Sequence, residues 1–173
     1  MFDPTLEVSS PPPNAQSGFH GLVAYVNHGR AELAGNFIPQ GFQQDQGECF
    51  VASNAYLTTQ PQFTNWVGGG TLSGGGAFRF GSLGSLAVAI NPGSSPGLLE
   101  VSVQGGASAL KPAPETIVNI EVGSSAIGKG YDQLSLLGTP VILDGLLQMK
   151  FIGDYVPANG VRFHAVAWNV TAH

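Results

Sequence analysis

One segment of this sequence has the residue order of a catalytic motif. Gly93-Ser94-Ser95-Pro96-Gly97 has the G-x-S-x-G spacing of a hydrolase nucleophile elbow, and Asp and His residues follow later in the chain. In that elbow the residue after the serine donates its backbone N–H to the oxyanion, and Pro96 has no N–H. The segment therefore favours a simple turn over a nucleophilic serine.

A second segment, Gly123 to Lys129 (GSSAIGK), imitates a phosphate-binding loop that follows an apolar strand. Gly130 stands where the Mg²⁺-binding Ser or Thr should be. The residues after it read as a strand, so the helix N-terminus that would favour an anion is missing from the pattern. We interpret this segment as a polar turn.

The histidine and cysteine residues do not have metal-ligand spacing. His20 and His28 flank a predicted strand and would lie about 27 Å apart in an extended chain. Cys49 is the single cysteine, so it has no partner for an intrachain disulfide or a metal pair, and we expect a buried, inert thiol. We expect no metal, no cofactor and no enzymatic activity.

The composition argues against helices, nucleic acid and membranes. Gly supplies 25 and Pro 12 of the 173 residues, and charged residues are only 10%. The net charge is -5, and the six Lys and Arg residues are scattered, so no basic stripe can neutralise phosphates. No apolar run approaches the roughly 20 residues that cross a bilayer. The first residues also lack the basic segment and apolar run of a signal peptide, so we expect synthesis without an export signal.

Short apolar segments separated by Gly, Pro, Ser and Asn turns predict an all-β fold. The expected strands lie in residues 21–29, 50–59, 77–80, 83–90, 98–103, 116–122, 132–137, 140–151 and 161–170. Asp144-Gly145 and Asn159-Gly160 are dipeptides of two-residue hairpins. An antiparallel β-sandwich or jelly roll is therefore one architecture that the turns allow.

The chain divides into three regions by composition. Residues 1–17 contain Pro11, Pro12 and Pro13 and predict an extended arm or linker. Residues 18–66 are rich in aromatic side chains, and they predict a β-rich cap or the first part of the main domain. Residues 67–173 carry the regular alternation of strands and turns.

Five motifs follow one another in the last region. They are Pro92-Gly93-Ser94-Ser95-Pro96-Gly97, Ile120-Glu121-Val122-Gly123, Gly130-Tyr131-Asp132-Gln133-Leu134, Gly145-Leu146-Leu147 and Tyr155-Val156-Pro157-Ala158-Asn159-Gly160. In this order they resemble the β-helical stalk segments of autotransporter passengers and of haemagglutinin-like or PEP-type sorted bacterial surface proteins. The resemblance covers residues 68 to about 164. It implies a right-handed parallel β-helix, or β-solenoid, in which inward residues stack and Tyr131 and Leu134 help to plug one end.

A stalk-like sequence without an export signal leads to a functional hypothesis. We expect a non-enzymatic structural protein of an external assembly, namely a phage capsid decoration or tail component at the virion surface. It would form a homo-oligomer and dock on a capsid or tail through its arm and apolar surface. The alternative is a segment of a secreted bacterial adhesin at the cell surface, and a glycan is a further candidate partner. The expected interaction residues are Phe2, Pro11, Pro12, Pro13, Phe37, Phe42 and Trp66.

Overall fold

The computed structural model describes residues 6–8, 23–93, 96–105, 110–126, 129–138, 141–142 and 144–169. These residues form strands and turns and include no helix, so the all-β prediction is confirmed. All strand pairs within the three sheets of the described chain are parallel. The antiparallel sandwich or jelly roll is therefore wrong.

The strands form three parallel sheets, here called A, B and C. Sheet A contains, in spatial order, β1 (Leu6–Val8), β3 (Arg30–Leu33), β5 (Glu48–Val51), β8 (Thr71–Gly74), β11 (Ala89–Pro92), β13 (Ile117–Val122) and β15 (Leu146–Phe151). Sheet B contains β10 (Ser82–Leu86), β7 (Thr64–Val67), β4 (Gly41–Gln44) and β2 (Val23–Val26). Sheet C contains β16 (Val166–Asn169), β14 (Gln133–Leu137), β12 (Leu98–Val103), β9 (Ala77–Phe80) and β6 (Tyr56–Thr58).

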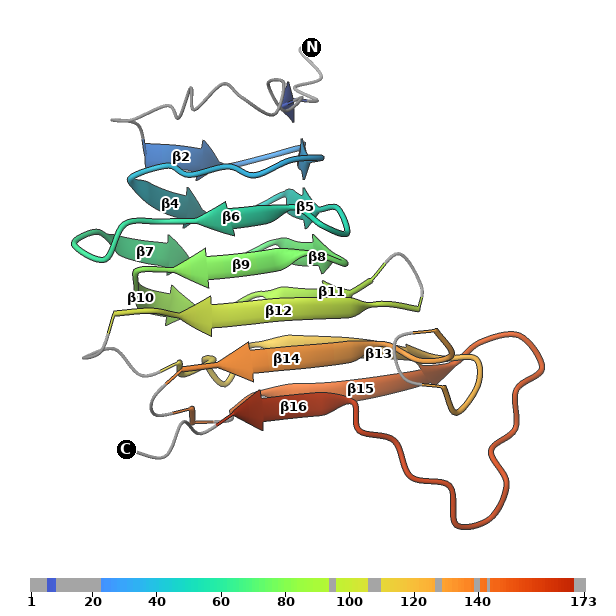
Figure 1. Cartoon of the computed structure of the whole chain (residues 1–173). Coiled ribbons are helices and arrows are strands. Elements are labelled where there is room, and N and C mark those ends of the chain that lie inside the picture. Colours follow the sequence, from blue (N-terminus) through green and yellow to red (C-terminus); the bar gives the residue numbers. More distant parts are fainter. Residues whose placement is uncertain are drawn as a thin grey trace.

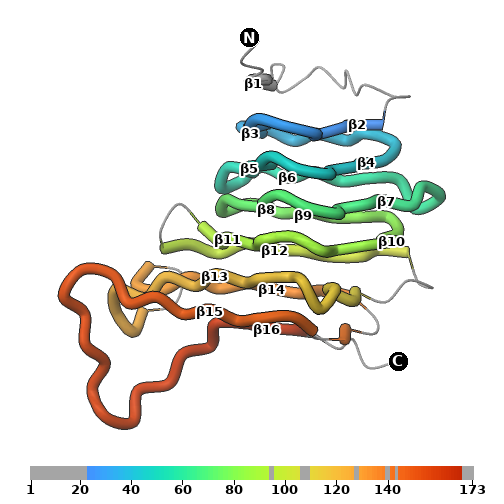
Figure 2. The backbone as a smooth tube through the Cα atoms, turned by 180° about the vertical axis from the view of Figure 1, so that it is seen from behind, coloured from blue at the N-terminus to red at the C-terminus, as the bar shows by residue number. Residues whose placement is uncertain are grey.

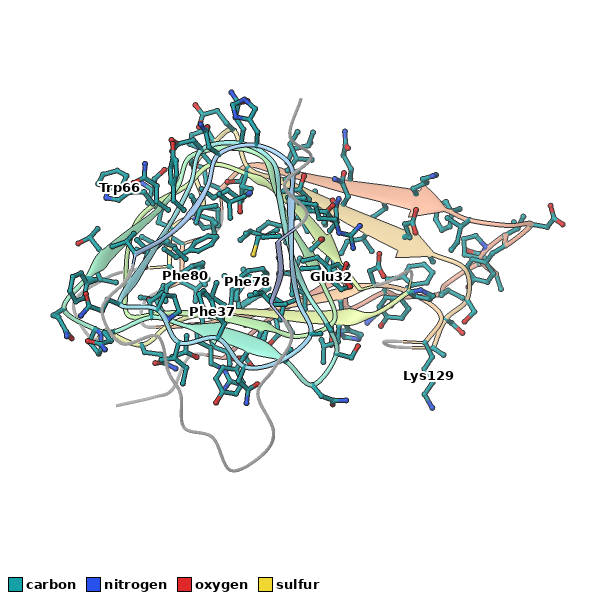
Figure 3. All side chains as sticks on the ribbon, turned by 90° about the horizontal axis from the view of Figure 1, so that it is seen from above. Glu32, Phe37, Trp66, Phe78, Phe80 and Lys129 are labelled. Atoms are coloured by element: carbon teal, nitrogen blue, oxygen red, sulfur yellow. The ribbon has the colours of Figure 1, made fainter. Side chains whose placement is uncertain are left out.

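The chain visits the sheets in a repeating order. From β4 to β12 it contributes one strand to sheet B, then one to sheet A and one to sheet C, and each round lies against the previous one (Figure 1). Seen from above, these strands surround a triangular interior (Figure 3). Among the described residues, sheet B ends at β10, and the layers after it contribute strands to sheets A and C. The last layer consists of β15 and β16, and a long loop projects between them (Figure 2).

The Asp144-Gly145 turn does not form the hairpin that its sequence allows. Val141, before the turn, makes an isolated parallel bridge with Leu110. After the turn, β15 pairs in parallel with β13 along its whole length, starting with Leu146 beside Ile117. Gly145 adopts a φ of 99° and directs the chain into the next layer of sheet A. Turn chemistry alone therefore does not distinguish a reversal from a step between layers.

The main core lies between the three sheets. Alternate residues of each strand point inward, because side chains alternate between the two faces of a strand. Phe42, Phe78 and Phe80 form the aromatic centre, with ring centroids 6.1 Å apart for Phe42 and Phe80 and 6.2 Å apart for Phe78 and Phe80. Figure 3 shows Phe78 and Phe80 inside the ring of strands. Leu, Val and Ile side chains of successive layers fill the rest.

Glycine is needed where the chain turns from one sheet to the next. Gly74 ends β8 with a φ of 110°, and a Cβ atom at this position would overlap the carbonyl oxygen of Val51 in the preceding layer. That oxygen accepts hydrogen bonds from the N–H groups of Gly75 (3.0 Å) and Gly76 (3.2 Å). Close approach between layers at such corners explains why a β-rich chain of this kind needs so much glycine.

The described sheets continue across the predicted boundary between residues 66 and 67. That boundary falls inside β7, which pairs with β4 on one side and β10 on the other. Within the predicted arm, β1 pairs in parallel with β3. The other residues of the arm lie outside the described residues.

Cys49 lies in the main core and is 1% exposed, so the expectation of a buried thiol is confirmed. Burial, reinforced by the Glu48 carboxylate, raises the pKa of the thiol to about 12. At pH 8 the thiolate fraction is then about a thousandfold below that of an ordinary thiol. We expect Cys49 to resist iodoacetamide in the native protein and to react rapidly in guanidinium chloride, as followed by mass spectrometry. Rapid modification of the native protein would contradict this position in the core.

Candidate interaction surfaces

Asp132 connects three of the motifs that the sequence places in order. The side chain is 2% exposed, and its two oxygens accept the backbone N–H groups of Gly97 and Glu121, each at 2.8 Å. Gly97 belongs to the first motif, Glu121 to the second and Asp132 to the third. Burial raises the pKa of Asp132 even though both hydrogen bonds favour the ionised form. The carboxylate is therefore a structural link between layers.

The neighbours of Asp132 hold the segment that returns to β16. The Tyr131 hydroxyl accepts the N–H of His164 at 3.2 Å, and the Gln133 amide donates to the His164 carbonyl at 2.7 Å. Tyr131 packs edge to face against Phe163, with ring centroids 5.3 Å apart. Tyr131 and Leu134 are both buried in the layer before the last. This segment therefore uses its polar groups to fix the fold.

The segments that resemble catalytic motifs are placed only in part. Ser94 and Ser95 lie outside the described residues. In the phosphate-loop imitation, the N–H groups of Gly123 and Ser124 donate to the Gly130 carbonyl at 2.6 and 2.7 Å, so this turn satisfies its own amides. Among the described residues there is no cluster of three His, Cys, Asp or Glu side chains with metal-site geometry. The same part of the chain has no helix long and apolar enough to cross a membrane.

The predicted interaction residues separate into different environments. Phe42 is 2% exposed and packs against Phe80, so its assignment to an interaction surface is wrong; the alternation of β4 turns it inward. Phe37 is half-buried and packs against the main core. Trp66 is 52% exposed and points away from the interior (Figure 3). The others, Phe2, Pro11, Pro12 and Pro13, lie outside the described residues.

In the last layer, formed by β15 and β16, several side chains continue the rows of core-facing residues of β13 and β14. No other described residues cover these side chains. Leu147, Met149 and Phe151 of β15 pair with Val118, Ile120 and Val122 of β13, and Trp168 of β16 pairs with Leu136 of β14. Ile120 and Leu136 are each 1% exposed, whereas Met149 is 41% and Trp168 54% exposed. We call Leu147, Met149, Phe151 and Trp168 the open end.

A cleft of about 460 Å³ lies at the open end. Its lining includes apolar side chains from sheets A and C, among them Leu134, Leu136, Leu147, Met149 and Trp168. Asp144 and His164 are the titratable residues in this lining. The cleft therefore suits an apolar occupant.

A second surface lies on the outer face of sheet B. Tyr25 on β2 pairs with Gln43 on β4, and Gln43 pairs with Trp66 on β7. We call these three side chains the aromatic column. The Tyr25 hydroxyl donates to the Asp45 carboxylate at 2.6 Å, which lowers the pKa of Asp45 and raises the pKa of Tyr25.

A third surface is polar and follows the outer face of sheet A. Asn119 donates to the Asn91 side chain at 2.7 Å, and Lys150 lies 3.6 Å from the Glu121 carboxylate. These residues border a depression of about 620 Å³ that also reaches Asp132. Because its amides and charges pair with one another between layers, we interpret this surface as support for the stack.

Comparisons with known protein families, curated proteins and solved structures found no match. The candidate surfaces therefore rest on the residues themselves. Sequence reasoning named Trp66 but missed Tyr25, Gln43 and the open end. Tyr25 lies in an apolar strand pattern, and its alternation was the available signal, but only strand pairing shows that it shares a column with Trp66.

Proposed function

We propose that this protein is a non-enzymatic structural unit with a β-solenoid fold, which associates with a second copy of itself through the open end. The observation that carries the proposal is the contrast between the covered column of β13 and β14 and the exposed column of β15 and β16. The repeated order of sheets B, A and C supports the solenoid, because each layer covers the apolar side chains of the one before it.

The chemistry of the open end supports another β-layer as its occupant. β15 and β16 are the last strands of sheets A and C, so their outer edges offer backbone groups for further pairing. Exposed Leu147, Met149 and Trp168 lie between these edges and would gain by leaving water. A strand-rich surface with apolar side chains would pair with the free strand edges and would also cover the exposed apolar side chains.

A second copy of this chain has the chemistry that such an occupant needs, because it presents the same strand edges and the same exposed apolar side chains. Each copy has the same open end, so one two-fold contact covers both ends and leaves neither free. A head-to-tail contact would leave another open end and continue as a filament. We therefore infer an end-to-end pair as the basic unit.

The association should depend on apolar side chains of the open end. Leu147→Lys places a charge in the contact but leaves the single chain folded, because Leu147 is 48% exposed. Val156→Lys is the matched control, since Val156 is 83% exposed on the projecting loop. By light scattering we expect a multiple of the 17.9 kDa chain mass for the wild type and Val156→Lys, and a single-chain mass for Leu147→Lys.

Two results would contradict this interface. A wild-type protein of single-chain mass at all concentrations would overturn self-association. An oligomer that survives Leu147→Lys would place the contact elsewhere on the molecule. Circular dichroism of each variant shows whether the loss of mass reflects separation of folded chains.

As the larger setting we propose an external assembly at a virion surface, where the oligomer serves as a capsid decoration or tail component. The low charge and the dense turns suit a rigid packing unit. Co-sedimentation with phage particles tests this setting. The oligomer should pellet with the particles and remain in the supernatant without them.

A surface adhesin is the second candidate. The hydrogen bonds that the Asp132 carboxylate accepts from the N–H groups of Gly97 and Glu121 favour it, because they provide a physical reason for the motif order that resembles bacterial surface stalks. Binding to whole bacterial or host cells, without co-sedimentation with phage particles, would favour the adhesin over the virion component.

A further inference from the structure

We propose that the aromatic column on sheet B, formed by Tyr25, Gln43 and Trp66, is a binding platform for a neutral oligosaccharide. This surface lies on the side of the stack and does not include the open end. The proposal therefore holds or fails independently of self-association.

The two aromatic rings are exposed although each belongs to a regular strand. Tyr25 is 54% and Trp66 52% exposed. Pyranose rings carry C–H groups on their faces, and they stack on aromatic rings while their hydroxyl groups seek hydrogen bonds. Tyrosine and tryptophan provide such apolar faces together with a polar group at low conformational cost.

The strand register sets the distance between the rings. β2 and β7 lie on either side of β4, and neighbouring strands are about 4.8 Å apart, so the Tyr25 and Trp66 positions are separated by about 10 Å. This separation is near the length of a disaccharide. Two sugar rings of one linear chain can therefore stack on the two aromatic side chains.

Both rings are held in place before any ligand binds. A Cβ atom at Gly84 would lie 2.9 Å from Cζ2 and 3.0 Å from Cε2 of Trp66, so the indole lies close over this glycine. Tyr25 is held by its hydrogen bond to Asp45, to which the Gln43 amide also donates at 3.2 Å. Preorganised rings lose little entropy on binding, which favours recognition.

The polar groups around the rings indicate a neutral ligand. Gln43 lies between the two aromatic residues. Thr64 on β7 and Ser82 on β10 pair with each other beside them on sheet B. Asp45 is the charged residue bonded to the column, and its carboxylate would repel an anionic sugar. Hydroxyl and amide groups instead match the uncharged hydroxyls of a hexose or N-acetylhexosamine chain.

Isothermal titration of the full chain with cellohexaose, maltohexaose and chitohexaose tests the platform, preceded by an array of neutral and acidic glycans. We expect binding to at least one neutral chain and a loss of about tenfold or more in affinity for Trp66→Ala and for Tyr25→Ala. Gly84→Ala should weaken binding as well, because the added methyl group displaces the indole without removing it.

Val156→Ala is the matched control, because Val156 is 83% exposed on the projecting loop and belongs neither to the aromatic column nor to the open end. It should bind with wild-type affinity. The proposal is overturned if no neutral glycan on the array binds, if only acidic glycans bind, or if Trp66→Ala and Val156→Ala change the affinity equally. Unchanged light-scattering masses for Trp66→Ala show that the platform and self-association are separate.

Discussion

Replacing Gly74 with alanine is expected to lower the free energy of unfolding by about 4 kcal/mol. Alanine adopts the φ of 110° at this position only with strain. Its Cβ atom would also overlap the Val51 carbonyl oxygen of the preceding layer. That oxygen cannot move freely, because it accepts the N–H groups of Gly75 and Gly76. The two penalties add, so the variant should be close to unfolding at room temperature.

Gly153→Ala separates the two contributions. Gly153 also has a positive φ, at 60°, but no atom lies within 4 Å of the position that a Cβ atom would take. Backbone strain alone should cost about 1 kcal/mol there. Urea unfolding followed by circular dichroism measures both variants. Equal losses of stability in the two would show that close contact between layers does not restrict Gly74.

Asp132→Ala is expected to destabilise the protein by about 3 kcal/mol. The substitution removes two hydrogen bonds to an ionised acceptor and leaves the N–H groups of Gly97 and Glu121 without this partner. Asp154→Ala is the control, because this exposed aspartate lies in the projecting loop, and its loss should change stability by less than about 0.5 kcal/mol. Similar urea midpoints for both variants would contradict the linking role of Asp132.

The difference in stability between the wild type and Asp132→Ala should depend on pH, and the pKa of Asp132 determines its direction. Burial raises the pKa of Asp132 above 3.8, so the folded chain holds this proton more tightly than the unfolded chain. The resulting stabilisation is complete below pH 3.8 and is lost as the pH rises through the raised pKa. The stability difference between wild type and Asp132→Ala should therefore grow as the pH falls through this window. A difference that shrinks on acidification would show that hydrogen bonding, rather than burial, dominates the pKa.

Local pattern was sufficient to locate several strands. The predicted segments 77–80 and 98–103 coincide with β9 and β12, because alternation and flanking glycines are properties of the segment itself. The predicted segment 50–59 instead divides between β5 and β6. Asn54 between them adopts a φ of 71°. Asparagine tolerates this left-handed conformation, but its presence in the sequence does not predict it.

The candidate surfaces depend on contacts between distant residues. Aromatic density around residues 37–66 drew attention to Trp66 and Phe42 alike. It did not distinguish the exposed Trp66 from the buried Phe42, because only the alternation within each strand decides which side chain faces the core. The aromatic column needs the register of three strands, and the open end needs the position of β15 and β16 at the edges of their sheets.

Composition and short-range periodicity were enough to establish that this protein is all-β, rich in tight turns, low in charge and supplied with a buried thiol at Cys49. Each of these properties belongs to a few neighbouring residues or to the chain as a whole. The register of the parallel strands, the link that Asp132 makes between three motifs and the exposed apolar side chains of the last layer emerged only from the folded arrangement. The physical reason is that strand pairing joins residues far apart in the chain, and its register is set by the packing of all layers together.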